Sequence, residues 1–183
     1  MNRLTKRLVG SFAAVAALAY LIAMVVTGAL PENRQIAEFK AAGVLEQAPE
    51  SIHRVALSTK HGSFVFVRQD AGWTSEAAGS ALGVEASEAL DRALTIMHNS
   101  KPVRMLALDE IGDSRPEEFG LAQPQLSVTL EDAKGVVLEA HFGASNTDGV
   151  LQFMSLKGGD RLYLMSDFVG QSWGKVASEQ GSS

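Results

Sequence analysis

The chain of 183 residues contains no cysteine. Disulfide bonds, thiolate metal sites and cysteine nucleophiles are therefore excluded. In an oxidising compartment, the stability of such a chain has to come from its hydrophobic core alone.

Basic residues are scarce beyond the first seven positions. Arg3, Lys6 and Arg7 are three of the 16 Lys and Arg residues, and residues 1–30 contain no acid. The rest of the chain therefore carries 13 basic and 21 acidic residues, a formal charge of −8. A domain this acidic does not bind nucleic acid or anionic headgroups through bulk electrostatics. We predict no nucleic-acid partner.

Phosphate-binding and metal-ligand motifs are also missing. The glycine-rich stretch 79–83 lacks the lysine of a phosphate-binding loop. No two histidines have the helical spacing of a metal site, so surface or strand-face positions explain all four. These are His53, His61, His98 and His141. We predict a protein that is not an enzyme, with no cofactor and no metal ligands.

One acidic region leaves an alternative open. It surrounds Arg115 and contains Asp109, Glu110, Asp113, Glu117 and Glu118. Carboxylate oxygens are the ligands that calcium prefers, but the alternating acids and central glycine of an EF-hand are absent. The region is either a solvated acidic loop or a site for a hard cation.

The most informative feature that the sequence does contain is one long apolar run. The 23 residues from Leu8 to Leu30 carry no charge and follow the basic residues 1–7. A helix of this length measures roughly 34 Å and crosses a hydrocarbon core of about 30 Å. Positive charge stays on the cytoplasmic side, so we predict a single-span inner-membrane anchor over 8–30 and an extracytoplasmic domain after it.

Two features of the apolar run bear on its role. A cleaved signal peptide is the alternative reading, because Thr27-Gly28-Ala29 resembles a cleavage site, although signal-peptide apolar regions are shorter. Gly10, Ala14 and Leu18 approximate a pattern of small residues at helical spacing. Such a pattern lets a second membrane helix approach closely, so these three are predicted interaction residues.

The remaining chain divides into a connector over 31–50, a domain over 51–176 and a flexible tail over 177–183. Within the domain, alternating apolar and polar residues around short glycine turns predict antiparallel hairpins. A period of three to four residues predicts a helix over 85–98, and a weaker one a helix over 167–176. Ser80 and Ser87 are candidate caps for the first helix. Trp73 and Trp173 are expected to serve packing.

Together these patterns predict an α+β fold. It consists of an N-terminal transmembrane helix, then a mainly antiparallel sheet of six or seven strands with two helices packed on one face.

The order of several short motifs carries a resemblance that covers roughly residues 50–176. They are Gly72-Trp73, a helix with Leu90, Leu94 and Met97, Val103-Arg104, Phe119-Gly120-Leu121 with Pro124, Val128-Thr129-Leu130, Phe142-Gly143, the strand Gly149–Phe153, and Leu162–Met165. This order resembles an uncharacterised bacterial family of single-span, membrane-anchored extracytoplasmic α+β proteins. Members are often encoded beside components of ABC-type, gliding-like exporters. The chain differs in having Phe119 where tyrosine is common and in a single copy of the unit.

The resemblance implies an architecture and a link to the exporter components encoded beside family members, but it supplies no catalytic residues. We expect a non-catalytic accessory or scaffolding subunit of an inner-membrane complex, linked to an ABC-type exporter. The polar loop 143–149 joins two predicted strands, and such loops carry binding contacts. Ser145, Asn146 and Asp148 are its predicted interaction residues. The alternatives are an extracytoplasmic module that binds a small ligand or cation, and an extracytoplasmic enzyme.

Overall fold

The computed structural model describes residues 43–70, 72–107, 110–111 and 116–180, together with Ala16, Ala19 and Tyr20. The predicted basic flank, nearly all of the predicted anchor and the first part of the connector lie outside these residues, and so do Gly10, Ala14 and Leu18. Within the described part of the chain, no helix is both long and apolar enough to cross a membrane.

The chain divides into two compact units, Met1–Lys40 and Ala41–Ser183. The described residues of the second unit form one antiparallel sheet, two α-helices and two short 3-10 helices. Its strands are β1 (Arg54–Thr59), β2 (Gly62–Gln69), β3 (Gly72–Ser75), β4 (Ser80–Ala81), β5 (Arg104–Ala107), β6 (Leu126–Asp132), β7 (Gly135–Ser145), β8 (Leu151–Leu156) and β9 (Arg161–Ser166). Its helices are η1 (Pro49–Ser51), α2 (Val84–Asn99), η2 (Pro116–Phe119) and α3 (Asp167–Gln180).

The predicted α+β class is confirmed. The described residues form one sheet of nine strands in the order β4-β3-β2-β1-β6-β7-β8-β9-β5, and every neighbouring pair is antiparallel. The prediction of six or seven strands was wrong because it missed β3 and β4 at one edge. These two strands have only four and two residues, too few to show a period of two.

The predicted antiparallel hairpins are present as the pairs β1–β2, β6–β7 and β8–β9. Side chains alternate between the two faces of the sheet, and the buried ones lie on the face that the helices cover. They include Val55 and Leu57 of β1 and Leu126, Val128 and Leu130 of β6. On the opposite face, Arg54 of β1 forms ion pairs with Glu76, directly after β3 (3.0 Å), and with Glu131 of the neighbouring β6 (2.8 Å). The hydrogen bonds that the Arg54 guanidinium donates, first to Glu76 and then to Glu131, raise its pKa above the ordinary value.

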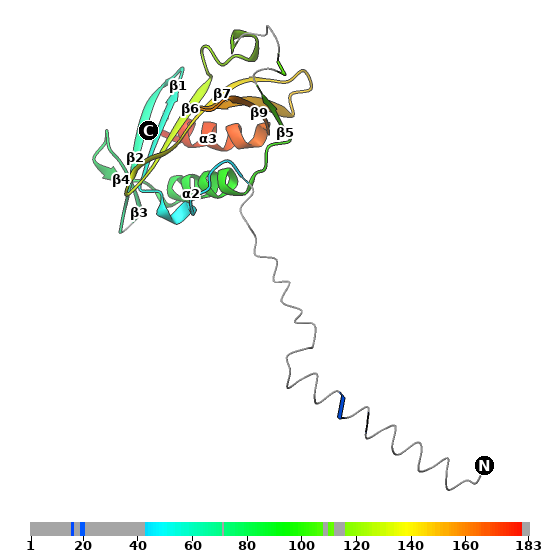
Figure 1. The fold of residues 1–183 in the computed structure, drawn as a ribbon. Helices are drawn as coiled ribbons and strands as arrows, with labels where there is room; N and C mark the ends of the chain where they lie inside the picture. Colours follow the sequence, from blue (N-terminus) through cyan, green and yellow to red (C-terminus); the bar gives the residue numbers. More distant parts are fainter. Residues whose placement is uncertain are drawn as a thin grey trace, which may run out of the picture. The chain divides into compact units, whose positions relative to one another are not determined.

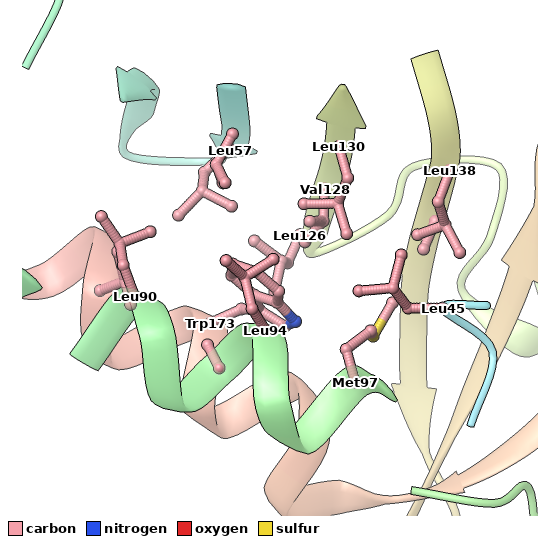
Figure 2. Packing of buried hydrophobic residues seen from close by; sticks show 14 of the residues in the cluster. Leu45, Leu57, Leu90, Leu94, Met97, Leu126, Val128, Leu130, Leu138 and Trp173 are labelled. Atoms are coloured by element: carbon pink, nitrogen blue, oxygen red, sulfur yellow. The ribbon is translucent and has the colours of Figure 1, made fainter. Parts of the chain in front are cut away.

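Both α-helices lie on the same side of the sheet (Figure 1). Figure 2 shows the core between the layers, with Leu57, Val128 and Leu130 of the sheet facing Leu90 and Leu94 of α2. Burying a side chain of this size contributes roughly 1.5–3 kcal/mol. Trp73 and Trp173 are 1% and 0% exposed, so both serve packing as expected.

Helix α2 confirms the predicted helix over 85–98, with corrections at its start. Leu90, Leu94 and Met97 are buried as the period indicated, whereas Val84 is 75% exposed. Val84 is the first residue of the helix and stands clear of the sheet. The N-cap is Gly83, which makes no side-chain hydrogen bond, so neither Ser80 nor Ser87 caps the helix.

The core reaches into both segments that flank the predicted domain. Leu45, in the predicted connector, is fully buried, and its carbonyl oxygen lies 2.9 Å from Nδ1 of His98 at the end of α2. Figure 2 shows Leu45 near Leu138 and Met97. At the other end, α3 continues to Gln180, past the predicted helix end at residue 176, and Ala177 packs in the core.

Strand β7 is irregular near its end, where the segment after η2 covers it. The register with β8 shifts between Phe142 and Ser145. A β-carbon on Gly143 would lie 2.1 Å from the carbonyl oxygen of Phe119, so only glycine allows this approach. The Phe119 ring packs against Phe153 of β8, with 4.9 Å between ring centroids.

Candidate functional site

A hollow lies between α3 and one end of the sheet. It is bounded by the turn between β1 and β2, the start of β6, the end of β7, the start of β8 and one face of α3, and its volume is about 550 Å³. We call it the α3 groove. Its apolar lining includes Phe64, Leu126 and Ala177, and its polar lining includes Ser145, Gln152 and Asp167.

Two glycines lie on the face of α3 that lines the groove, beside Asp167, Gln171, Ala177 and Ser178. Gly170 and Gly174 are four residues apart, so they lie on the same face of the helix. A β-carbon on Gly174 would meet no atom within 4 Å, whereas one on Gly170 would lie 2.0 Å from Oε1 of Gln152. Gly170 thus allows α3 to approach β8 closely, and Gly174 leaves open space beside it.

Gln152 is a buried polar side chain that lines this space. It is 7% exposed, and its Nε2 donates a hydrogen bond of 3.0 Å to the carbonyl oxygen of Gly143. Its Oε1 is buried and accepts no hydrogen bond from the part of the chain that the structure describes. Leaving a buried acceptor unpaired costs about 1–3 kcal/mol, so this oxygen is a strained element of the fold.

An acidic group lies at the β8 end of the groove. Asp167, the first residue of α3, accepts a hydrogen bond from Oγ of Ser145 (3.1 Å) and one from Nε2 of Gln171. Both donors are neutral, and Asp167 forms no ion pair with another described residue. The carboxylate is therefore held in place by hydrogen bonds without a neutralising charge beside it.

Two basic side chains lie at the opposite end, in the turn between β1 and β2. The hydroxyl of Thr59 accepts a hydrogen bond from the amide of His61 (3.1 Å) and donates one to the carbonyl of Gly62 (3.2 Å). The turn is thereby fixed by its own residues. Lys60 and His61 are exposed, line the groove, and form no side-chain ion pair within the described ranges.

The residues predicted in the loop 143–149 are separated by the structure. Ser145 lines the α3 groove and bonds to Asp167. Asn146 instead closes the turn, because its Oδ1 accepts hydrogen bonds from the amides of Val150 (3.1 Å) and Leu151 (3.0 Å). Asp148 is exposed at the tip and does not line the groove. Their role in an interaction stays a prediction.

The sequence reasoning missed Lys60, Gln152, Asp167 and the two glycines of α3. One signal for the glycines was present, since Gly170 and Gly174 fall inside the predicted helix with helical spacing. Glycine in a helix interior costs about 0.5–1 kcal/mol relative to alanine, so two on one face indicate a spatial requirement.

A second polar cluster lies on the sheet face opposite the helices. Nδ1 of His141 lies 2.9 Å from Oγ of Ser127, its partner across the strands, and Nε2 lies 3.6 Å from Oε1 of Glu139. Lys157 holds the same glutamate at 2.9 Å. Serine, histidine and glutamate are the residue types of a hydrolase triad. Here they do not line the α3 groove, and the arrangement is that of cross-strand polar pairs on a sheet face.

The acidic region around Arg115 is described only in part. Asp109, Asp113 and Arg115 lie outside the described residues. Glu110 accepts a hydrogen bond of 3.0 Å from the amide of Ala107, so it caps the end of β5. Among the residues that are described, no group of three histidine or acidic side chains is placed to hold a metal ion.

The chain matches no protein-family model, no curated protein and no solved structure. The resemblance to the family of membrane-anchored α+β proteins therefore stays a prediction.

Proposed function

We propose that this chain is a membrane-tethered, non-catalytic accessory subunit whose outer domain binds a small molecule in the α3 groove. The predicted anchor over residues 8–30 and the family resemblance suggest its setting, an inner-membrane complex linked to an ABC-type exporter. Tethering would raise the concentration of the domain near its membrane partners without any additional contact.

The observation that carries the binding role is the open groove beneath α3. Its volume of about 550 Å³ falls within the range of small-molecule sites, about 300–1,000 Å³. Protein interiors are normally close-packed, so a helix with only a structural role would fill this space with side chains. Gly174 leaves this space open, and the unpaired Oε1 of Gln152 is buried in the wall of the groove; both features destabilise the domain on its own. Selection for a ligand site explains their presence.

The binding role can be tested by filling the groove. A leucine at position 174 would project into open space, so Gly174→Leu is expected to fold and to occupy the site. The full chain, purified in mild detergent, is screened against a library of small amphipathic molecules by thermal unfolding. We expect compounds that raise the Tm of the native chain in a saturable way and lose this effect on Gly174→Leu.

The matched control is Lys175→Leu, which adds the same side chain at the next, exposed position of α3 outside the groove. It is expected to respond to ligands as the native chain does. If no compound stabilises the native chain, or if Gly174→Leu responds unchanged, the groove is not a binding site.

The accessory role has a separate test. The tagged chain is purified from crosslinked membranes, and the proteins that accompany it are identified by mass spectrometry. A version carrying an unrelated membrane span serves as the control. Recovery of one stoichiometric membrane complex supports the proposal, and recovery of the chain alone contradicts it.

A further inference from the structure

We propose that the α3 groove binds a linear zwitterion, specifically a peptide of about four residues with free termini. The proposal rests on the binding role of the groove and adds the chemistry of its ligand. The peptide would place its ammonium group at Asp167 and its carboxylate at Lys60 and His61.

The first argument is the charge at the two ends of the groove. Asp167 lies at one end and Lys60 at the other, next to His61, and none of the three has an ion-pair partner among the described residues. The carboxylate of Asp167 and the ammonium of Lys60 line one cavity but form no ion pair with each other. A ligand with a cationic and an anionic end would complement both at once.

The second argument is the distance between these ends. Helix α3 starts directly after β9 and crosses the sheet toward β1 (Figure 1). From Asp167 to Ala177 the helix rises about 15 Å. In the sheet, β8 and β1 are three strand spacings apart, which is about 14 Å. An extended chain advances about 3.3 Å per residue, so a peptide of about four residues spans the groove.

The third argument is the excess of acceptors at the Asp167 end. An ammonium group has three donors and no acceptor. The Asp167 carboxylate lines the groove and accepts hydrogen bonds from Ser145 and Gln171. A carboxylate offers about four acceptor positions, so an ammonium can donate to those that remain.

The middle of the groove fits a peptide backbone with apolar side chains. Gly174 leaves open space beside the helix, so a main chain can lie close to α3 at this position. Phe64, Leu126 and Ala177 provide apolar contact. We therefore choose Ala-Leu-Leu-Ala as the probe.

Calorimetric titration of the full chain in mild detergent tests the proposal with four forms of the probe. These forms are the free peptide, the N-acetylated peptide, the C-amidated peptide and the peptide blocked at both ends. We expect the free peptide to bind most tightly, each single block to weaken binding at least tenfold, and the doubly blocked form to bind weakest.

Two variants then connect each terminus to its side chains. Asp167→Asn is expected to remove the preference for a free N-terminus and to keep the preference for a free C-terminus. The double variant Lys60→Gln, His61→Gln is expected to do the reverse. Asp160→Asn and Lys134→Gln are the matched controls, because they change the same charges in exposed turns at the opposite end of the sheet. Both should bind as the native chain does.

The outcomes separate this proposal from the binding role itself. If the blocked peptides bind as well as the free one, if no form binds at millimolar concentration, or if the two variants affect both termini equally, the zwitterion proposal is wrong. The binding role still stands if other small molecules bind the native chain and are excluded by Gly174→Leu. If nothing in the library binds either, both proposals fail.

Discussion

Gln152 and Gly170 occupy the same small space between β8 and α3. A β-carbon at position 170 would lie 2.0 Å from Oε1 of Gln152 and 3.3 Å from Cδ1 of Phe142. The glutamine cannot easily turn away, because its Nε2 is bonded to the carbonyl of Gly143. The distance between helix and sheet is therefore set by one missing methyl group, and the groove depends on it.

The variant Gly170→Ala is expected to lower the free energy of unfolding. Overpacking of this kind costs about 1–3 kcal/mol, which exceeds the roughly 1 kcal/mol gained from the higher helix propensity of alanine. Urea denaturation measures the change. The double variant Gly170→Ala, Gln152→Ala should recover part of the loss, since it removes the obstructing side chain. Additive effects of the two substitutions would show that the residues are not coupled.

At position 174 the same substitution is expected to have the opposite effect. A β-carbon at position 174 would meet no atom within 4 Å, so the substitution changes only the conformational freedom of the backbone. We expect the free energy of unfolding to rise by about 0.5–1 kcal/mol. Thermal unfolding of the two alanine variants side by side is the measurement. A loss of stability at position 174 would mean that the groove is filled by neighbouring side chains.

Leu45 is expected to contribute to the core although it precedes the predicted domain. It is fully buried, so Leu45→Ala should lower the free energy of unfolding by about 2–5 kcal/mol. Glu46→Ala is the matched control, because the neighbouring glutamate is exposed. Equal stability of the two variants in denaturant would argue that residues 43–48 are not packed on the domain.

The two tryptophans should differ when each is replaced by phenylalanine. Nε1 of Trp73 donates to Asp91 (3.0 Å), and Arg68 lies 4.3 Å from the ring centroid. Nε1 of Trp173 is buried and makes no hydrogen bond to any residue that the structure describes. Since a hydrogen bond to a charged group is worth about 1.5–3 kcal/mol, Trp73→Phe should cost more stability than Trp173→Phe by about that amount. The reverse order in denaturant titrations would contradict this account of both sites.

The predicted anchor over 8–30 can be checked on the mature chain. If the anchor is retained, the whole chain stays in the membrane fraction after carbonate extraction. Protease added outside the inner membrane should then degrade the C-terminal domain. Mass spectrometry of the purified chain distinguishes the alternative, since signal-peptide cleavage would give a chain that begins after residue 29. A domain protected from external protease would contradict the predicted orientation.

Local patterns were sufficient for most of the fold. Period-two alternation predicted the hairpins β1–β2, β6–β7 and β8–β9, because one face of each strand is buried and the other is not. A helical period predicted α2, whose buried residues recur every three or four positions. Strands β3 and β4 escaped detection because they are too short to show a period.

The sequence by itself determined an α+β domain without disulfides, an excess of acid and an apolar run suited to a membrane. Tertiary structure alone decided the α3 groove. Gly170 contacts Gln152, and Gly174 faces open space, only because α3 packs across the strands. Oε1 of Gln152 is left unpaired because Gly170 of α3, 18 residues later in the chain, lies against it. Asp167 and Lys60 lie at the two ends of the groove because of the order of the strands in the sheet. No local pattern in the sequence predicts that order.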